Sequence, residues 1–409
     1  MLNSLLLIAA ILLGHFGWWL ACYNRLNALA IPRRTIKRIE RVLVLLSVLL
    51  PWLFVFLDRA EFTWSKLFHD APELLLSGRV PVLSAWSALS LISLAMLGPG
   101  WLESRLWLFP PKNLRDEKNT RFRTSEFLAE PVTVNRLSKL CNRLPGNEIT
   151  HLTLTEKKIA LEMHRARSWS HVRIGHLSDL HFTGQLSRDF YRFALDKLSA
   201  AEPDMIVLTG DIIDKDHCLP WIEELLLGVQ APLGKFFLIG NHEQRVSNVS
   251  DVIERMTAAH WFDLGTSSAV IEPVRSGQPR IRLFGNELPW YQRSSEVPAV
   301  RTNSQEVSSG EAAGELLLGA AHTPDQFPWA RRLRLDLLLA GHTHGGQVRF
   351  PLIGPIVAPS RHGSRFASGV FRLPPTVMHV SRGLAGCHPL RWRCPPEVAV
   401  LDIVTGSRA

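Results

Sequence analysis

Apolar residues gather in three long runs near the start of the chain, whereas the remainder alternates short apolar runs with polar clusters. The long runs are Leu2–Ala21, Val42–Leu57 and Val80–Leu102. The first has the roughly 20 residues that a helix needs to cross a bilayer. The second is shorter and contains Pro51, and the third carries Trp86 and Trp101 near its ends, as interfacial anchors do. We predict a transmembrane anchor of about three helices over residues 1–102; a buried helix of a soluble domain remains an alternative, mainly for the second run.

The first run is predicted to be an anchor rather than a cleaved signal peptide. Signal peptides begin with positive charge, but no Lys or Arg precedes Arg25. Six basic residues lie between the first two runs, three between the second and third, and six soon after the third. Short cytoplasmic loops are the ones that collect Lys and Arg. If all three runs span, the N-terminus therefore lies outside and the large C-terminal domain lies in the cytoplasm.

The part of the chain after the third run is predicted to fold as an α/β domain. Residues 103–170 are polar and interrupted by prolines, which indicates a linker that ends in a lead-in strand, Ile149–Thr155. From 171 to 405, short apolar runs typical of buried strands alternate with helical patterns. The predicted strands are Val172–Leu177, Met205–Leu208, Phe236–Ile239, Ile281–Phe284, Leu316–Ala320, Leu337–Ala340, Thr376–Val380 and Val398–Ile403.

Helices are predicted between these strands, and the first has a recognisable start. Ser187 is a plausible N-cap, because an apolar stripe at helical spacing follows it. Residues 220–229 and 250–260 also have helical patterns, and the small, polar segment 302–315 is typical of an exposed loop. The predicted fold class is a layered β-sheet core flanked by helices.

Charge and cysteine content limit the classes of binding partner and the redox compartment that the sequence suggests. The chain has 46 Lys and Arg against 37 Asp and Glu, a formal net charge of +9. The basic residues flank the apolar runs, which favours a membrane surface, and we expect no nucleic-acid partner because no basic–aromatic pattern is present. Five cysteines form an odd number without a CxxC framework. Cys387 and Cys394 could pair or bind zinc, but reduced thiols are favoured, which agrees with a reducing compartment.

Clusters rich in Asp, His and Asn follow five of the predicted strands. They are Asp179–His181, Gly210–Asp211, Gly240–Glu243, His322 and Gly341–His344. Taken singly, each has an ordinary explanation as a helix cap, a turn or a satisfied polar side chain. Strand carboxyl ends, however, converge at one edge of an α/β sheet. Five such clusters would bring unpaired polar groups into one cleft, which costs free energy. A pair of divalent metal ions bound by these groups would remove that cost.

In order and approximate spacing, these clusters resemble the calcineurin-like metallophosphoesterase superfamily over about residues 170–405. The runs GHTHGGQV (341–348) and Ser381-Arg382-Gly383 further resemble a bacterial membrane-associated branch of predicted phosphohydrolases. The resemblance implies a metallophosphoesterase-like fold over 171–405. It also implies an integral protein of the bacterial inner membrane.

The resemblance also implies roles for single residues, with two divalent metal ions, manganese, iron or zinc, as the cofactor. The ligands of the first ion are Asp179, His181 and His344, those of the second are Asn241, His322 and His342, and Asp211 bridges both. His242 is the implied catalytic residue, which stabilises the transition state or protonates the leaving group. Glu243 departs from many bacterial relatives, which have Asp there.

Other residues near the motifs have open interpretations. Asp214 and Asp216 are interpreted as turn residues or as supports for the ligands. Arg361, His362 and Arg365 follow the last motif, and contact with substrate phosphate and a solvated basic loop explain them equally well.

The leading hypothesis is a membrane-anchored phosphohydrolase. It would cleave a phosphate ester or pyrophosphate of a phosphorylated small molecule or a lipid-linked substrate by attack of a metal-bound hydroxide. The alternative is a non-catalytic membrane scaffold or sensor with a relic phosphoesterase domain. The presence of all seven ligand positions and His242 favours the enzyme. A nuclease would need a basic groove, which the sequence does not reveal.

Overall fold

The computed structural model describes residues 1–76, 78–106, 111–161, 171–275, 278–293, 315–386 and 388–405. Cys387 and all of the predicted loop 302–315 except Glu315 lie outside these residues. The chain forms two compact units. The helical unit comprises Met1–Phe109 and Pro359–Arg365, and the sheet unit comprises Pro110–Ala358 and Phe366–Ala409.

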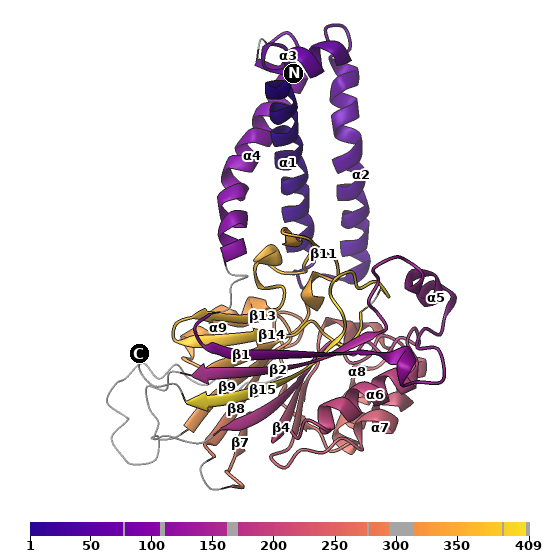
Figure 1. Ribbon diagram of the computed structural model, residues 1–409, viewed down its shortest axis with the longest axis vertical. Coiled ribbons are helices and arrows are strands. Elements are labelled where there is room, and N and C mark those ends of the chain that lie inside the picture. The colour runs from indigo at the N-terminus through magenta and orange to yellow at the C-terminus, as the bar shows by residue number, and fades with distance from the viewer. Residues whose placement is uncertain are drawn as a thin grey trace. The chain divides into compact units, whose positions relative to one another are not determined.

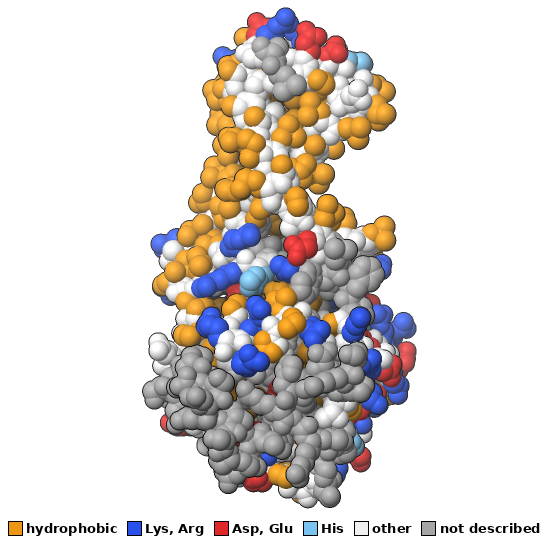
Figure 2. All heavy atoms as spheres, turned by 90° about the vertical axis from the view of Figure 1, so that its left-hand side faces the viewer, with side chains coloured by type: hydrophobic (Ala, Val, Ile, Leu, Met, Phe, Trp, Pro, Cys, Tyr) orange, Lys and Arg blue, Asp and Glu red, His pale blue; other side chains and the backbone are white. Residues whose placement is uncertain are grey.

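The helical unit contains α1 (Leu2–Leu26), α2 (Arg33–Leu57), α3 (Trp64–Leu76) and α4 (Pro81–Leu106). Helices α1, α2 and α4 are long and apolar enough to cross a membrane. On the face that Figure 2 shows, hydrophobic side chains cover much of this unit. The exposed hydrophobic residues of α2 include Leu45 and Trp52. Helix α2 starts well before the predicted apolar run, and Pro51 lies inside it without ending it. The three helices are therefore candidate membrane spans.

Buried polar contacts tie the helices of this unit together. Asp58 Oδ2 accepts a hydrogen bond from the Leu83 N–H (2.7 Å), and Trp86 Nε1 donates to His15 Nδ1 (3.0 Å). The segment Pro359–Arg365 belongs to this unit although it follows the last metal-binding motif in the sequence. In it, Arg365 forms an ion pair with Glu103 at 3.0 Å.

The sheet unit contains two large sheets (Figure 1). In spatial order, the seven-stranded sheet consists of β1 (Leu114–Arg123), β2 (His151–Leu161), β15 (Glu397–Thr405), β3 (Val172–Leu177), β4 (Met205–Thr209), β5 (Lys235–Leu238) and β6 (Phe262–Asp263). The six-stranded sheet consists of β13 (Gly369–Leu373), β14 (Thr376–Val380), β10 (Leu337–Ala340), β9 (Glu315–Ala321), β8 (Arg280–Asn286) and β7 (Ala269–Ile271). A short hairpin joins β11 (Arg349–Phe350) to β12 (Gly354–Pro355).

The two sheets share one hydrophobic core. Ile174 and Val207 of the seven-stranded sheet belong to the same buried cluster as Leu318 and Leu339 of the six-stranded sheet. A second core lies on the other face of the seven-stranded sheet, beneath α6 (Arg188–Ser199), α7 (Pro220–Leu226) and α8 (Val249–Ala258). The predicted fold class, a layered sheet core flanked by helices, is confirmed.

Local sequence explains most of these elements. The buried strands occur where unbroken apolar runs predict them, and Ser187 caps α6 by accepting a hydrogen bond from the Phe190 N–H (3.3 Å). Strand β1 differs, because it lies in the predicted linker. It pairs antiparallel with β2 at the edge of the sheet, and most of its side chains are exposed. An exposed edge strand needs no apolar alternation, so its sequence, LRDEKNTRFR, resembles a linker. Two short helices, α5 (Arg136–Asn142) and α9 (Phe327–Arg332), complete the unit.

Candidate metal centre

The predicted ligands lie in tight turns at the carboxyl ends of parallel strands. Strands β3, β4 and β5 are parallel neighbours in one sheet, and β9 and β10 are parallel in the other. Five of the turn residues have φ between 45° and 70°: Asp179, His181, Asp211, His342 and His344. Each such conformation costs a non-glycine residue about 1–3 kcal/mol and persists only where the surrounding structure enforces it. The turns therefore hold these side chains in place although their backbone conformations are energetically unfavourable.

Close packing of the turns requires glycine at two positions. A Cβ atom on Gly240 would collide with Asp211, and one on Gly341 would collide with Ser178. Backbone hydrogen bonds also join the turn after β3 to that after β4, from the Asp179 N–H to Gly210 O (3.0 Å). Clusters that are far apart in the sequence thus pack closely against one another at one edge of the sheet.

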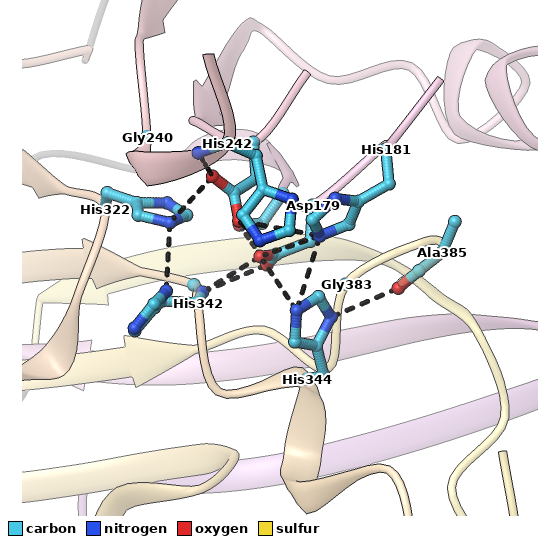
Figure 3. A network of polar contacts seen from close by, with 12 residues as sticks. Asp179, His181, Gly240, His242, His322, His342, His344, Gly383 and Ala385 are labelled. Atoms are coloured by element: carbon cyan, nitrogen blue, oxygen red, sulfur yellow. Dashed lines mark hydrogen bonds and ion pairs between the residues drawn. The ribbon is translucent and has the colours of Figure 1, made fainter. Parts of the chain in front are cut away.

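A first group of buried ligand atoms comprises Asp179, His181, Asp211 and His344. Figure 3 labels three of them, Asp179, His181 and His344. These atoms all lie within 4.8 Å of one another. His181 Nε2 lies 3.3 Å from His344 Nε2 and 3.5 Å from Asp211 Oδ2. His344 Nε2 lies 3.7 Å from Asp179 Oδ1. The group thus places two carboxylates and two imidazoles close enough together to bind a single metal ion.

A second group comprises Asp211, His322 and His342. His322 Nε2 lies 3.2 Å from Asp211 Oδ1 and 3.1 Å from His342 Nδ1. The side-chain oxygen of Asn241 lies 3.1 Å from the same His322 nitrogen. The structure thus brings all seven predicted ligands together, and Asp211 belongs to both groups.

Two polar atoms of this site lack a hydrogen-bond partner in the part of the chain that the structure describes. Asp211 Oδ2 and His342 Nε2 are buried and have no hydrogen-bond partner within the described ranges. Burial holds the pKa of His342 and of His344 well below the ordinary value, so both imidazoles are neutral and offer lone pairs. Burial opposes charge on His322 as well, but Asp211 raises the pKa of His322 to about 9. Metal binding would displace that proton, and this donor set fits two divalent cations.

His242 lies beside the two groups and is oriented by Asp214. Asp214 Oδ1 lies 2.6 Å from His242 Nδ1 and 3.0 Å from His181 Nδ1, and Asp214 Oδ2 accepts from Arg245 Nη1 (3.1 Å). Burial opposes the charge of Asp214, but His181 and His242 hold its pKa well below the usual range. The opposite ring nitrogen of His242 lies 3.8 Å from Asp211 Oδ2. Asp214 therefore fixes the ring orientation of one predicted ligand and of the predicted catalytic residue.

Glu243 acts on the backbone of the turns. Its Oε1 accepts hydrogen bonds from the N–H groups of Ile212 (2.6 Å) and Ile213 (3.1 Å), and its Oε2 accepts one from Gly240 (2.6 Å). Burial, with a smaller contribution from Asp211, raises the pKa of Glu243 to about 7. The carboxyl group thus joins the turn after β4 to the turn after β5.

Arg391 is a support that the sequence analysis missed. Its guanidinium is fully buried and donates to the backbone carbonyls of His344 (3.1 Å), Arg382 (2.6 Å), Gly383 (3.4 Å) and Ala385. His344 Nδ1 in turn lies 3.1 Å from Ala385 O. Arg391 thus fixes both the backbone of His344 and the carbonyl that orients its ring. A single arginine in a proline-rich segment gives no sequence signal for this role.

The remaining singled-out residues lie outside the two ligand groups. Asp216 accepts hydrogen bonds from the N–H and hydroxyl of Ser247, both at 2.8 Å, which supports its interpretation as a turn residue. Arg361, His362 and Arg365 belong to the helical unit. Cys394 is a free thiol whose Sγ lies 3.4 Å from the His344 carbonyl.

Comparison with known proteins identifies the domain. The sequence model of the calcineurin-like phosphoesterase family matches residues 172–346, which include both ligand groups. The chain carries a calcineurin-like phosphoesterase domain. This family uses a dinuclear divalent metal centre, so the chain is a metal-dependent phosphoesterase, and the predicted superfamily is confirmed.

Three relatives show the range of this similarity. The uncharacterized metallophosphoesterase YkuE of Bacillus subtilis is 27% identical over 240 residues, which cover 56% of this chain and 78% of YkuE. The phosphodiesterase YaeI of Escherichia coli is 28% identical over 234 residues, covering 56% of this chain and 80% of YaeI. The UDP-2,3-diacylglucosamine pyrophosphatase LpxG of Chlamydia muridarum is 23% identical over 279 residues, covering 56% of this chain and 83% of LpxG.

Proposed function

We propose that this protein is a membrane-anchored phosphohydrolase that uses two metal ions to cleave a phosphate ester or pyrophosphate of a lipid-linked substrate. The observation that carries the proposal is the sharing of Asp211 between two buried ligand groups. Its Oδ2 atom and His342 Nε2 have no hydrogen-bond partner within the described ranges. Leaving such atoms buried and unpaired is costly, and two bound cations would remove the cost.

The ligand atoms form two groups, and each group would hold one metal ion. Asp179, His181 and His344 would hold the first ion, and Asp211 belongs to both groups. His322, His342 and the amide oxygen of Asn241 would hold the second ion. Imidazole, carboxylate and amide donors suit manganese, iron and zinc.

The chain's own residues orient and protonate the substrate. A metal pair held by these residues would supply a water molecule activated at neutral pH and positive charge near the phosphoryl oxygens. His242 acts as the acid that protonates the leaving oxygen, or stabilises its charge, because its Nε2 atom faces the ligand groups and lies 3.8 Å from Asp211 Oδ2. Asp214 holds the His242 ring in that orientation at 2.6 Å.

A lipid-linked substrate is supported by two independent observations. Helices α1, α2 and α4 are candidate membrane spans. The relative LpxG is named for a pyrophosphatase activity on a diacylated sugar nucleotide. A membrane anchor would keep the phosphoesterase domain at the membrane, where a substrate whose phosphate is carried by a lipid is found.

A hydrolysis panel on the full-length, detergent-solubilised chain tests this function. The protein is loaded with manganese and offered water-soluble phosphomonoesters, phosphodiesters and lipid pyrophosphates. We expect turnover that chelation removes and manganese restores, with lipid pyrophosphates preferred. The Asp211→Asn variant is the matched control for contaminating phosphatases. Tight binding of two metal ions without turnover on any class would instead favour the non-catalytic scaffold or sensor.

Reporter fusions at the C-terminus test the proposed topology, in which the phosphoesterase domain faces the cytoplasm. The proposal rests on the basic residues that flank the helices, and α2 must span for it to hold. We expect a fluorescent GFP fusion and an inactive alkaline phosphatase fusion. The reverse pattern would place the domain outside and move the substrate to envelope phosphates.

A further inference from the structure

The hairpin of β11 and β12 displays apolar side chains on the surface of the sheet unit. It begins at Arg349, shortly after His344, and its tip comprises Pro351, Leu352 and Ile353. Leu352 is 103% exposed, and Ile353 and Phe350 are each 41% exposed. Exposed apolar side chains that neighbour one another in this way are a feature of interaction surfaces.

The hairpin is held in a defined shape. The Arg349 N–H donates to Trp392 O (3.0 Å), and the Trp392 N–H donates to Gln347 O (2.9 Å). The Phe350 ring packs edge-on against the Trp392 ring at 5.7 Å between centroids. Leu352 itself has a φ of 62°, which is uncommon for leucine. An unfavourable backbone conformation thus coincides with the most exposed side chain of the hairpin.

Chain continuity indicates what covers this surface. The segment Pro359–Arg365, which follows the hairpin directly, belongs to the unit of the candidate membrane helices. A fully extended chain spans at most about 3.6 Å per residue, so the distance from Leu352 to Pro359 is at most about 25 Å. A short stretch of chain therefore connects the apolar tip to the unit that contains the candidate membrane helices.

Chemistry around the tip fits a lipid surface as well. Arg349 and the exposed Arg393 flank the aromatic pair Phe350 and Trp392. Arginine beside aromatic and aliphatic side chains is the combination found at the boundary of headgroups and acyl chains. Such cations are also attracted to anionic phospholipids.

We propose that the β11–β12 hairpin is a bilayer-contacting element. Phe350, Leu352 and Ile353 enter the headgroup boundary of the membrane, and Arg349 and Arg393 contact lipid phosphates. The inference rests on the proposed membrane anchoring and deepens it. Because the hairpin starts shortly after His344, its seating presents the metal centre to the headgroup layer, where a lipid-borne phosphate lies.

Site-specific photocrosslinking in the full chain tests this contact. Benzoylphenylalanine replaces Leu352 or Ile353 in separate variants, which are reconstituted in nanodiscs of phosphatidylethanolamine and phosphatidylglycerol in equal parts and then irradiated. Val274 is the matched control, because it is 65% exposed and lies next to β7, at the other end of the sheet unit from β11 (Figure 1). Leu45, an exposed residue of α2, reports on the anchor itself.

We expect lipid adducts at Leu352 and Ile353 at least about tenfold above those at Val274, because apolar side chains at the acyl boundary are in continuous contact with lipid. Lipid adducts at Leu45 with only the Val274 level at both hairpin positions would overturn the inference and leave the anchor intact. Adducts between two copies of the chain at these positions would also overturn it and assign the hairpin to a dimer interface. Absence of lipid adducts at Leu45 would sink the proposed anchoring and the inference with it.

Discussion

Two buried carboxylates in the sheet unit, Glu397 and Asp211, have opposite surroundings. Glu397 Oε1 lies 3.2 Å from Arg382 Nη2 and 3.5 Å from Lys157 Nζ, and its Oε2 accepts from the Arg382 N–H (2.8 Å). Asp211 Oδ1 accepts from the His242 N–H (2.9 Å), while its Oδ2 has no hydrogen-bond partner in the described part of the chain. The first carboxylate is enclosed by its partners, and the second faces imidazole nitrogens.

The difference lies in how permanent the compensating charge is. Burial opposes ionisation of Glu397, but Arg382 and Lys157 hold its pKa well below the ordinary value. The Arg382 guanidinium keeps its charge at every physiological pH. Asp211 is also held at a low pKa against burial, by His242 and His322, which carry charge only when protonated. A carboxylate with permanent partners stabilises the fold, whereas one that depends on titrating partners is ready to receive a metal ion.

The largest expected effect comes from removing the Asp211 charge. In Asp211→Asn both ligand groups lose their common anion, so bound metal should fall from two ions to one or fewer. Turnover should fall by more than the roughly 10²–10⁴-fold that a lost acid–base group costs. Elemental analysis of protein purified without chelator, together with turnover in added manganese, measures both. Retention of two ions would contradict the comparison, because the charge of Asp211 would then be no more necessary for metal binding than that of Glu397.

Sequence reasoning located this site because its signal is local. Each predicted strand is an apolar run with a polar cluster directly after it, and the parallel arrangement of β3, β4 and β5 brings those clusters to one edge. The order of elements and the convergence of the ligands could therefore be predicted from the residues alone.

The supports of the site were harder to predict because they act across the fold. Arg391, which the sequence did not indicate, binds carbonyls in two separate turns. The sequence left Asp214 open between a turn residue and a support for the ligands, and only its contacts with His181 and His242 favour the support. The edge strand β1 and the β11–β12 hairpin were not predicted from the sequence for another reason. Their exposed side chains follow no core pattern, so local hydrophobicity carries no information about them.

The next effect concerns His242, which touches Asp211 without belonging to either ligand group. His242→Ala should keep both metal ions and lower turnover by about 10²–10⁴-fold, the usual contribution of an acid–base group. Metal content and turnover are measured on the same preparation. Substrates with better leaving groups should lose less turnover, because they need less protonation. Loss of metal in this variant would exchange the roles assigned to His242 and Asp211.

A smaller effect is expected at Asp214, which orients two histidines without facing the centre. Asp214→Asn keeps the shape but removes the charge beside His181 and His242. Loss of such a support typically costs about 10–100-fold in metal affinity or activity. Competition with a fluorescent chelator measures the affinity, and turnover at saturating manganese measures the rest. Asp216→Asn is the matched control, because Asp216 contacts Ser247, outside the ligand groups. Equal effects at both positions would indicate general destabilisation instead.

The smallest effect on chemistry, and the largest on stability, is expected at Glu397. Glu397→Gln leaves Arg382 buried without its anion and leaves Lys157 with only the longer contact to Glu117 (4.0 Å). The loss should cost about 3–5 kcal/mol of unfolding free energy and lower the Tm by on the order of 10 °C. Turnover per folded molecule and metal content should stay near those of the native protein. The low pKa of Glu397 in the folded state means that its contribution is present above the unfolded pKa of about 4.3 and is lost as pH falls below it. Thermal unfolding at a series of pH values should therefore show the two proteins converging in acid. A variant that keeps its Tm but loses metal would show that the enclosed carboxylate also serves the metal centre.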